Sequence, residues 1–300
     1  QFRADSWSIP QLHKASNVAY KRMRKLKTYK NSKAYLQDTA STLELKEVEN
    51  NLILGICNSL SDKIKNNDNY HFINLFQDNK IVATSIKTST KVIISSTTEN
   101  KLDIKGISDF YTDNKINVDG VISESFTAET FAELYKREIL RVKPLLVQKL
   151  IKTNDITISD GCFEACSIND TELLVEWTFN FFEEEELIPK KSMSEVENTV
   201  KGLLETQDFF CWKYNGKIVS IAAILRKTKN IGIVGLVFTP KEYRGNGYAS
   251  SCVKKLSDHI LENGFKCCGL FTDKANPTSN KIYRQIGYET VSEFKNIEFA

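Results

Sequence analysis

The sequence predicts an α/β fold with mixed sheets, divided between two domains. Its 300 residues are about twice the length of an ordinary domain. In each half, segments with helical apolar spacing are interspersed with short apolar runs typical of strands. Residues 77–83 (Gln-Asp-Asn-Lys-Ile-Val-Ala) also resemble residues 214–220 (Tyr-Asn-Gly-Lys-Ile-Val-Ser). Hairpin chemistry alone could produce this similarity, but a tandem repeat explains it together with the element order, so we expect domains at 1–152 and 153–300.

The first half should contain helices followed by a group of short strands. Asp78 and Asn79 separate two strand-like runs and are typical of a hairpin turn. The polar stretch 97–118 is expected to be irregular. In chain order, the other expected elements are helices at 10–30 and 44–60, strands at 71–76, 81–87, 92–95 and 120–123, and a helix at 128–140.

The second half repeats this arrangement and ends with further helices and strands. Ser192 and Glu195 have the spacing of a capping box at a helix start, and Asn215 with Gly216 predicts a hairpin turn. In chain order, we expect a strand at 161–166, helices at 170–187 and 192–205, strands at 209–214, 217–227 and 232–238, a helix ending near 263, a strand at 267–272, a helix at 278–285 and a strand at 290–299.

The composition is typical of a soluble globular protein, with 41% hydrophobic and 26% charged residues. No apolar run approaches the roughly 20 residues that a membrane-spanning helix needs, so we expect no membrane association. The first residues lack the charged and then apolar pattern of a signal peptide. These features predict a cytoplasmic protein.

The charge distribution is uneven. Residues 1–35 hold nine Lys and Arg against one Asp, whereas the rest of the chain is net negative. A basic segment can bind nucleic acid or an acidic membrane. A solvated helix face is the more common role of such a segment, so we expect no nucleic-acid partner.

The seven cysteines predict no disulfide framework and no metal site. Their number is odd and no Cys-x-x-Cys spacing occurs, which favours reduced, buried thiols. No group of potential ligands has metal-binding spacing, and we expect no metal.

The most informative stretch joins the apolar run 231–238 to the helix that ends near 263. It contains Arg-Gly-Asn-Gly-Tyr-Ala at 244–249. A strand that leads through glycines into a helix builds a phosphate site, because the first N–H groups of the helix are unpaired and face the positive end of its dipole. Neither the P-loop pattern nor the dinucleotide-binding glycine pattern is present. Gly245 and Gly247 can adopt positive φ, and Arg244 adds a charge beside the phosphates.

These residues resemble the Q/R-x-x-G-x-G/A signature of the GNAT superfamily of N-acetyltransferases. The resemblance extends to Asn-Pro-Thr-Ser-Asn at 276–280 and to Ile-Tyr-Arg-Gln-Ile-Gly-Tyr at 282–288. Within the superfamily, the chain is similar to predicted acetyltransferases related to glycine-N-acyltransferase-like proteins. The resemblance implies two GNAT-like domains, and the first is degenerate because its corresponding segment, 100–106, lacks the signature.

The resemblance also implies a set of site residues around an acyl-CoA co-substrate, most simply acetyl-CoA. Tyr283 matches the tyrosine that protonates the CoA sulfur, and a phenol with an ordinary pKa near 10 is protonated at neutral pH. Packing and local capping are alternative roles for Tyr283, Asn276 and Asn280. The implied cofactor-binding residues are Leu236, Val237, Phe238 and Thr239 along the strand, Arg244, Gly245, Asn246, Gly247, Tyr248 and Ala249 in the turn, and Asn276 and Asn280 beside the pantetheine.

The general base and the acceptor are less defined. The strand 232–238 holds no Asp, Glu or His. The run of four glutamates at 183–186 favours a solvated acidic face, although one or two of them at the site entrance would attract a cationic amine.

The sequence therefore predicts an acyl-CoA-dependent N-acyltransferase that acts on a small-molecule or peptide amine by direct attack in a ternary complex. Transfer of a longer acyl group or to an amino acid is one alternative, and a non-catalytic CoA-binding module is another. The sequence does not indicate an oligomeric state.

Overall fold

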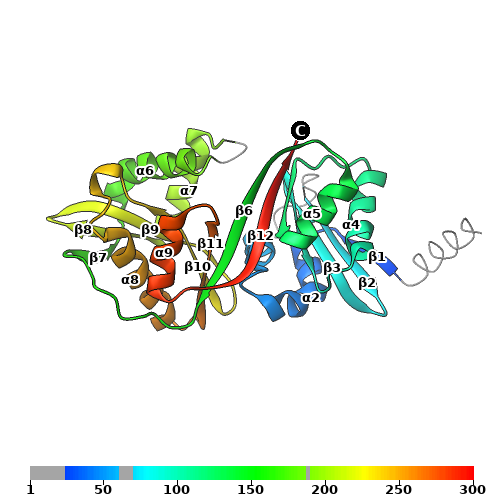
Figure 1. Ribbon diagram of the computed structural model, residues 1–300, viewed down its shortest axis with the longest axis horizontal. Coiled ribbons are helices and arrows are strands. Elements are labelled where there is room, and N and C mark those ends of the chain that lie inside the picture. Colours follow the sequence, from blue (N-terminus) through cyan, green and yellow to red (C-terminus); the bar gives the residue numbers. More distant parts are fainter. Residues whose placement is uncertain (1–23, 61–69, 187–189) are drawn as a thin grey trace, which may run out of the picture. The chain divides into compact units, whose positions relative to one another are not determined.

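The computed structural model describes residues 24–60, 70–186 and 190–300, which form two compact units. Unit 1 contains the described residues up to 45, residues 57–142 and residues 295–300, and unit 2 contains residues 46–56 and 143–294. Helices and strands are mixed in both units, so the α/β class is confirmed (Figure 1). The expected boundary after residue 152 differs from this division, because the chain crosses between the units at four places, after residues 45, 56, 142 and 294.

Unit 2 is built on a mixed sheet in the strand order β6-β11-β10-β9-β8-β7. The β10–β11 pair is parallel and the other pairs are antiparallel. The strands are β6 (Ile139–Leu150), β7 (Cys162–Ala165), β8 (Phe209–Tyr214), β9 (Lys217–Lys227), β10 (Ile231–Phe238) and β11 (Cys267–Asp273), and the helices are α6 (Thr171–Glu184), α7 (Met193–Glu205), α8 (Tyr248–Glu262) and α9 (Pro277–Ile286), with short 3-10 turns at Ile168–Asp170 and Lys241–Tyr243.

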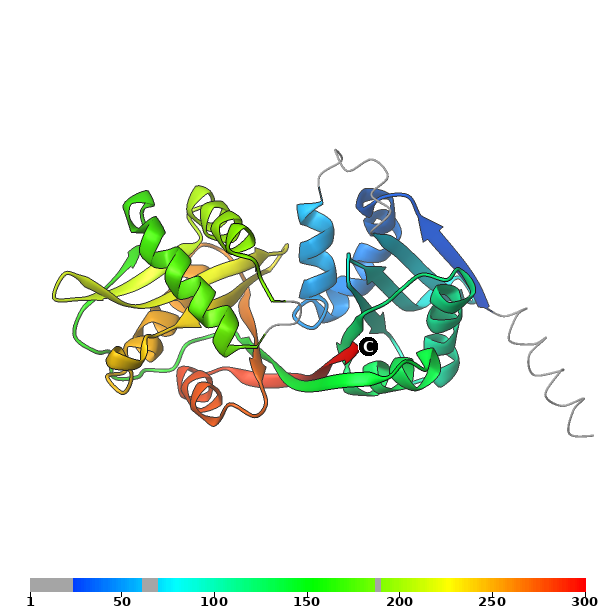
Figure 2. The same ribbon diagram turned by 90° about the horizontal axis from the view of Figure 1, so that it is seen from above.

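Helices cover both faces of this sheet, because alternate residues of its central strands are apolar on both sides. On one face, Val234 packs with residues of α8 and α9, including Leu256 and Ile286. On the other, Leu236 packs with residues of α6 and α7, including Trp177. Figure 2 shows α6 crossing the strands of this sheet.

Unit 1 repeats the pattern of unit 2. Its sheet has the order β1-β2-β3-β4-β5, followed by the end of β12, and β4 and β5 are parallel, as are β10 and β11. The elements of this half are β1 (Arg24–Tyr29), α2 (Ser32–Leu43), a 3-10 turn (Glu44–Lys46), α3 (Asn51–Ser59), β2 (His71–Gln77), β3 (Lys80–Lys87), β4 (Lys91–Ser96), α4 (Lys101–Asp113), β5 (Gly120–Glu124) and α5 (Ser125–Tyr135).

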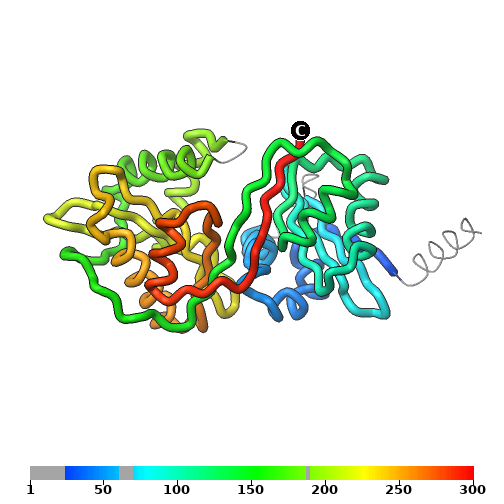
Figure 3. Tube along the Cα trace, in the orientation of Figure 1, coloured from blue at the N-terminus to red at the C-terminus, as the bar shows by residue number. Residues whose placement is uncertain are grey.

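The chain leaves unit 1 along β6 and returns to it along β12 (Glu289–Phe299), as the trace in Figure 3 shows. The backbone N–H of Phe299 donates to the carbonyl of Asp119 (2.9 Å). The Glu298 side chain accepts from Lys91 Nζ of β4 (2.9 Å). The last residues of the chain therefore complete the sheet and core of unit 1.

Most elements expected in the second half are confirmed within one to three residues. Ser192 and Glu195 form both hydrogen bonds of the capping box. Both predicted hairpin turns have positive φ, at Asp78 and Asn79 in unit 1 and at Asn215 and Gly216 in unit 2, as their tight geometry requires.

Several expectations for the first half are wrong. Residues 24–29 of the expected helix form β1, and its residues 10–23 lie outside the described residues. Of the expected helix at 44–60, residues 51–59 form α3, whereas residues 44–46 form a 3-10 turn and residues 47–50 a turn. The stretch 97–118 is not irregular, since it contains α4. The helix expected at 128–140 ends at Tyr135, and β6 begins at Ile139.

Two further findings concern the sequence as a whole. Within the described ranges, no helix combines the length and apolar character needed to cross a bilayer. All seven cysteines are free thiols, but Cys162 is exposed and Cys166 half-buried, so the expectation of uniformly buried thiols is wrong for these two.

Candidate functional site

The site begins where β10 and β11 separate. Their parallel pairing covers only three positions, from Ile231 with Cys267 to Ile233 with Gly269. Beyond them, β11 continues beside β6 and β10 beside β9. The edge of β10 at residues 234–238 therefore carries backbone groups outside the β11 ladder.

The strand is also irregular at this point. The β9–β10 register shifts between Gly235 and Phe238, and Leu236 has φ of 47°. A positive φ in a leucine is uncommon and costs about 1 kcal/mol or more, so tertiary packing must hold it. The Leu236 and Phe238 side chains are buried on the α6 face, where the Phe238 ring lies edge-on to Trp177.

These placements define what residues 236–239 can offer a ligand. The side chains of Leu236 and Phe238 are in the core, and Val237 is half-buried against the other core. Thr239 Oγ1 donates to Ser220 Oγ (2.9 Å). Their contribution to a ligand would therefore come from the backbone, because their side chains are already packed or bonded.

The glycine turn follows β10 directly. Gly245 and Gly247 have φ of 84° and 75°, and Gly247 is the N-cap residue of α8. Among the residues that the structure describes, no side chain caps this helix start, and its first turn holds no acidic residue. Unpaired N–H groups at the positive end of a 15-residue helix attract an anion.

The turn is braced from an irregular segment that precedes β7. Ser159 Oγ donates to the carbonyl of Asn246 (2.7 Å), and Ser159 N–H donates to Ser251 Oγ (2.9 Å). The Asn246 side chain donates to the carbonyl oxygens of Tyr243 and Arg244. No sequence pattern marked Ser159, because its partners are distant in the chain.

Tyr248 and Ala249 form the start of α8. The Tyr248 side chain is 9% exposed and its ring lies 5.7 Å from that of Tyr214, so it anchors the helix start in the core. Ala249 is half-buried. The small side chain of Ala249 leaves the first helical turn open to a ligand.

Arg244 is held at the turn by two partners. Its Nε donates to the carbonyl of Thr239 (2.8 Å), and its guanidinium contacts both carboxylate oxygens of Glu184 (2.8 and 2.9 Å). Arg244 and Glu184 are each 45% exposed. An anion at this turn would therefore compete with Glu184 for Arg244.

Tyr283 lies on α9 and is 8% exposed. Its hydroxyl has no hydrogen-bond partner among the described residues. Burial, reinforced by the negative charge of Glu185, raises the pKa of Tyr283 well above its ordinary value. The hydroxyl therefore stays protonated at neutral pH, as a proton donor must.

Asn276 and Asn280 organise the turn that leads into α9. Asn276 is its N-cap and accepts from the Ser279 N–H (3.1 Å), with Pro277 in the first helical turn. Asn280 donates to the carbonyl of Asp273 (3.1 Å), and its oxygen lies 3.4 Å from the donor nitrogen of Gln148. The capping role considered from the sequence is present in Asn276, whereas Asn280 ties α9 to the end of β11.

The run at 183–186 is engaged in ion pairs. Glu183 pairs with Lys190, Glu184 with Arg244 and Glu185 with Lys143. Sequence reasoning identified this run but missed Lys143, which comes from β6.

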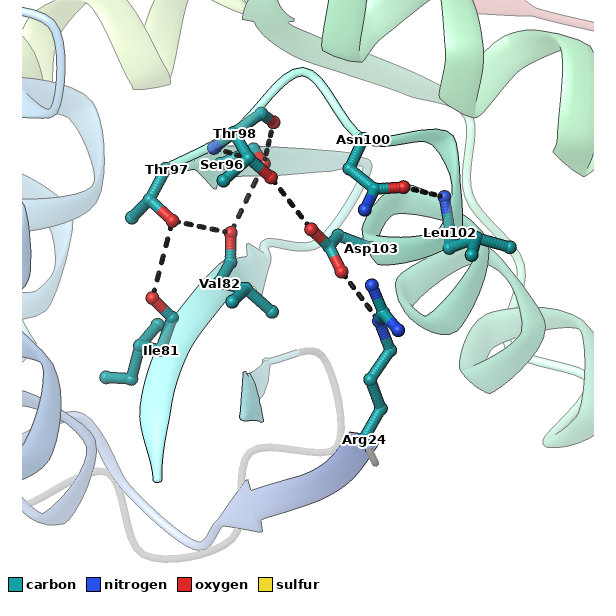
Figure 4. Close-up of polar contacts among 9 residues, drawn as sticks. All are labelled: Arg24, Ile81, Val82, Ser96, Thr97, Thr98, Asn100, Leu102 and Asp103. Carbon is teal, nitrogen blue, oxygen red and sulfur yellow. Dashed lines mark hydrogen bonds and ion pairs between the residues drawn. The ribbon is translucent and has the colours of Figure 1, made fainter. Parts of the chain in front are cut away.

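In unit 1, the turn that corresponds to the glycine turn lies between β4 and α4, and N–H groups at the start of α4 already have partners. Figure 4 shows Asn100 accepting from the Leu102 N–H (2.9 Å) at the start of α4. The buried Asp103 carboxylate in the first turn accepts from Arg24 Nε (2.7 Å) and from Thr98 Oγ1 (2.8 Å). A helix start that carries its own cap and carboxylate is unsuited to a second anion.

A separate cavity of 240 Å³ lies in unit 2 beside α9, and it includes none of the glycine-turn residues. It is lined by Leu146, Gln148, Asn280, Arg284, Tyr288, Glu289 and Thr290.

Comparisons with known proteins agree with this geometry. Residues 171–288 match the model of the acetyltransferase (GNAT) family. No curated protein matches the sequence. Among solved structures, a GNAT-family acetyltransferase from Colwellia psychrerythraea is similar at 14% identity with a TM-score of 0.56, covering 92% of this chain and 100% of that one.

Two further structures show the same fold. A GCN5-related N-acetyltransferase from Sphaerobacter thermophilus is 12% identical with a TM-score of 0.61, covering 92% of this chain and 95% of its own. A tandem GNAT protein from the clavulanic acid biosynthesis pathway is 9% identical with a TM-score of 0.53. The similarity covers 91% of this chain and 98% of that one.

The fold and the site define this chain as an α/β protein with diverging parallel strands that lead into an uncapped helix. More particularly, residues 171–288 of unit 2 are similar to the acetyltransferase (GNAT) family over about two fifths of the chain.

Proposed function

We propose that the chain transfers an acetyl group from acetyl-CoA to a primary amine, by direct attack within a ternary complex. The observation that carries this proposal is the uncapped start of α8, with two positive-φ glycines, directly after the diverging end of β10. The pyrophosphate would lie on residues 244–249, and the pantetheine and the acyl carbonyl along the backbone of residues 236–239. Asn276, the N-cap of α9, and Asn280 in its first turns would border the pantetheine.

Two chemical roles are assigned to residues of the chain, stabilisation of the oxyanion and protonation of the departing sulfur. A backbone N–H near residues 236–239 would stabilise the developing oxyanion, a kind of interaction worth on the order of 3 kcal/mol. The Tyr283 hydroxyl would donate its proton to the departing sulfur, and its raised pKa keeps that proton in place at neutral pH.

We further propose that only unit 2 binds the cofactor. The α4 start in unit 1 is occupied by Asn100 and by the Asp103–Arg24 ion pair. Unit 1 would therefore be the degenerate GNAT-like domain of a tandem pair. One CoA per chain is the expected stoichiometry.

The test is calorimetric titration of the full chain with CoA and with acetyl-CoA, followed by thiol release with a panel of amines. Ala249→Glu should abolish binding, because its carboxylate would face the phosphates. Ala249→Gln is the matched control of similar size without charge, and it should bind at least tenfold more tightly than the glutamate variant. Absence of binding by the native chain would overturn the proposal.

Turnover distinguishes the remaining functional alternatives. Competition by longer acyl-CoA thioesters, and preference for an amino-acid acceptor such as glycine, would indicate the branch related to glycine-N-acyltransferase. Tight CoA binding with no acetylation of any amine would instead indicate a CoA-binding module.

A further inference from the structure

The end of α6 reaches two parts of the proposed site through adjacent residues. Glu184 contacts Arg244 of the glycine turn, and Glu185 contacts Lys143 of β6. Because the side chains of neighbouring helical residues point about 100° apart, the two carboxylates contact different partners. This segment is therefore placed between the phosphate end and the chemical end of the site.

Lys143 links Glu185 to the end of β11. Its Nζ lies 2.6 Å from Glu185 Oε2, 3.1 Å from the Glu185 backbone carbonyl and 3.6 Å from Asp273 Oδ2. The Lys143 side chain is only 13% exposed, whereas that of Glu185 is 33% exposed. A lysine with two contacts to one glutamate fixes that glutamate's position.

Tyr283 provides an independent observation at the same place. Its side chain is more than nine-tenths buried, and its hydroxyl has no partner in the described part of the chain. The charge of Glu185 acts on this hydroxyl and raises its pKa further after burial. Asn280, one turn before Tyr283, donates to the Asp273 carbonyl, so the first turn of α9 is tied to the end of β11.

One oxygen of Glu185 is available. Lys143 bonds to Oε2, whereas Oε1 has no hydrogen-bond partner among the described residues. A carboxylate that is fixed through one oxygen and open at the other, close to a buried proton donor, is suited to accept a proton from a second reactant.

We propose that Glu185 accepts the proton that the acceptor amine loses, and that Lys143 is the positioning residue that holds Glu185 for this step. This inference rests on the proposed function. The acceptor class it implies is a primary amine that is cationic in solution, since Glu185 and Asp273 present carboxylates on this side of the site.

The proton balance of the step is complete. The ammonium first gives one proton to Glu185, which releases it to solvent. The neutral amine nitrogen then forms a bond to the acyl carbon and gives its second proton to Glu185 Oε1. As the carbon–sulfur bond breaks, the sulfur takes one proton from the Tyr283 hydroxyl. Solvent then removes this proton from Glu185 and returns one to Tyr283, so that an ammonium and a thioester become an amide, a thiol and one proton in solvent.

The test uses the full chain, acetyl-CoA and a primary alkylamine that the native chain acetylates. Glu185→Gln should lower kcat by about 100-fold, the lower end for a general base, with CoA affinity unchanged. Glu183→Gln is the matched control, because it removes the same charge from the neighbouring pair with Lys190. Equal activity of these two variants would overturn the role of Glu185.

The role of Lys143 is tested by the pH dependence of kcat/KM. The charged and titratable groups around Glu185 are Lys143 on β6, Asp273 on β11, Tyr283 on α9, and Glu184 and Glu186 on its own segment. Lys143→Met removes the positive charge that favours the carboxylate, so the acidic limb of the profile should move to higher pH. Lys143→Arg should keep the limb near its native position.

Two results separate failure of this inference from failure of the proposed function. If the native chain binds no CoA or acetylates no amine of the panel, the proposed function fails. If it acetylates an amine but the Lys143→Met profile has an unshifted acidic limb, the positioning role alone is wrong.

Discussion

At the scale of single residues, the backbone geometry of the glycine turn depends most strictly on Gly247. Its φ of 75° is strained for any residue with a Cβ, and a Cβ there would lie 2.6 Å from Ser159 Oγ. Gly245 has a similar φ of 84°, but a Cβ at that position would meet nothing within 4 Å. A Cβ at either glycine would strain the backbone, but only a Cβ at Gly247 would also clash with a neighbouring side chain.

We expect Gly247→Ala to weaken CoA binding more than Gly245→Ala, because only the first change displaces the Ser159 brace. Each should lose about 1 kcal/mol of folding stability from the left-handed conformation. Calorimetry with CoA and urea unfolding of both variants would check this. Equal losses of affinity would show that Ser159 does not support the turn.

Residue identity in the turn could be read from the sequence, whereas its surroundings could not. Arg244 and the two glycines stand in one short motif. Ser159 and Lys143 are distant from it in the chain, and neither belongs to a local pattern. Contacts made only by the tertiary fold leave no signal in a single sequence.

At the scale of elements, the end of α6 and the glycine turn are joined by the Glu184–Arg244 ion pair. Both side chains are half-exposed, so the pair contributes little to stability. Its effect on an incoming anion is larger, because the anion must replace the carboxylate at Arg244. The Thr239 carbonyl keeps Arg244 in place without Glu184.

Glu184→Gln should therefore tighten CoA binding, by about two- to fivefold at low salt, which corresponds to up to about 1 kcal/mol for an exposed pair. Titration at low and high salt would measure the change, and it should shrink as salt screens the charges. Glu183→Gln, which leaves Arg244 paired, is the control. Weaker binding by Glu184→Gln would mean that Glu184 orients Arg244 for the ligand.

The elements that sequence reasoning missed have physical explanations. β1 is a lysine-rich edge strand that pairs with β2, and its pattern of exposed lysines resembled a helix face. In α4 the buried apolar side chains are few, chiefly Ile104, Ile107 and Tyr111. The second half was predicted well because its strands are continuously apolar and its turns contain glycine.

At the scale of the whole molecule, a segment from the first half of the chain belongs to unit 2. Glu47 accepts from Thr228 Oγ1 (2.5 Å), the Asn230 N–H (2.9 Å) and Asn230 Nδ2 (2.8 Å). Burial alone would raise the pKa of Glu47, but these hydrogen bonds outweigh it and lower the pKa below its ordinary 4.5. A lowered folded-state pKa stabilises the fold above about pH 4.5 and loses this effect as the pH falls.

Glu47→Gln should accordingly destabilise unit 2 at pH 7, by about 1–2 kcal/mol for weakened hydrogen bonds to a charged group. The difference from the native chain should decrease as the pH falls below about 4.5. Urea unfolding at pH 7 and pH 4 would measure it. A difference that stays constant with pH would show that the carboxylate charge is not what matters.

The placement of residues 295–300 in unit 1 has a consequence for how the chain folds during its synthesis. Unit 1 is translated before unit 2, yet its sheet and core require a strand that is translated after unit 2. A nascent unit 1 would therefore expose the β5 edge and the apolar positions that Ile297 and Phe299 later cover. We therefore expect unit 1 to complete its core only after unit 2 has been translated, with its apolar surface exposed during that interval.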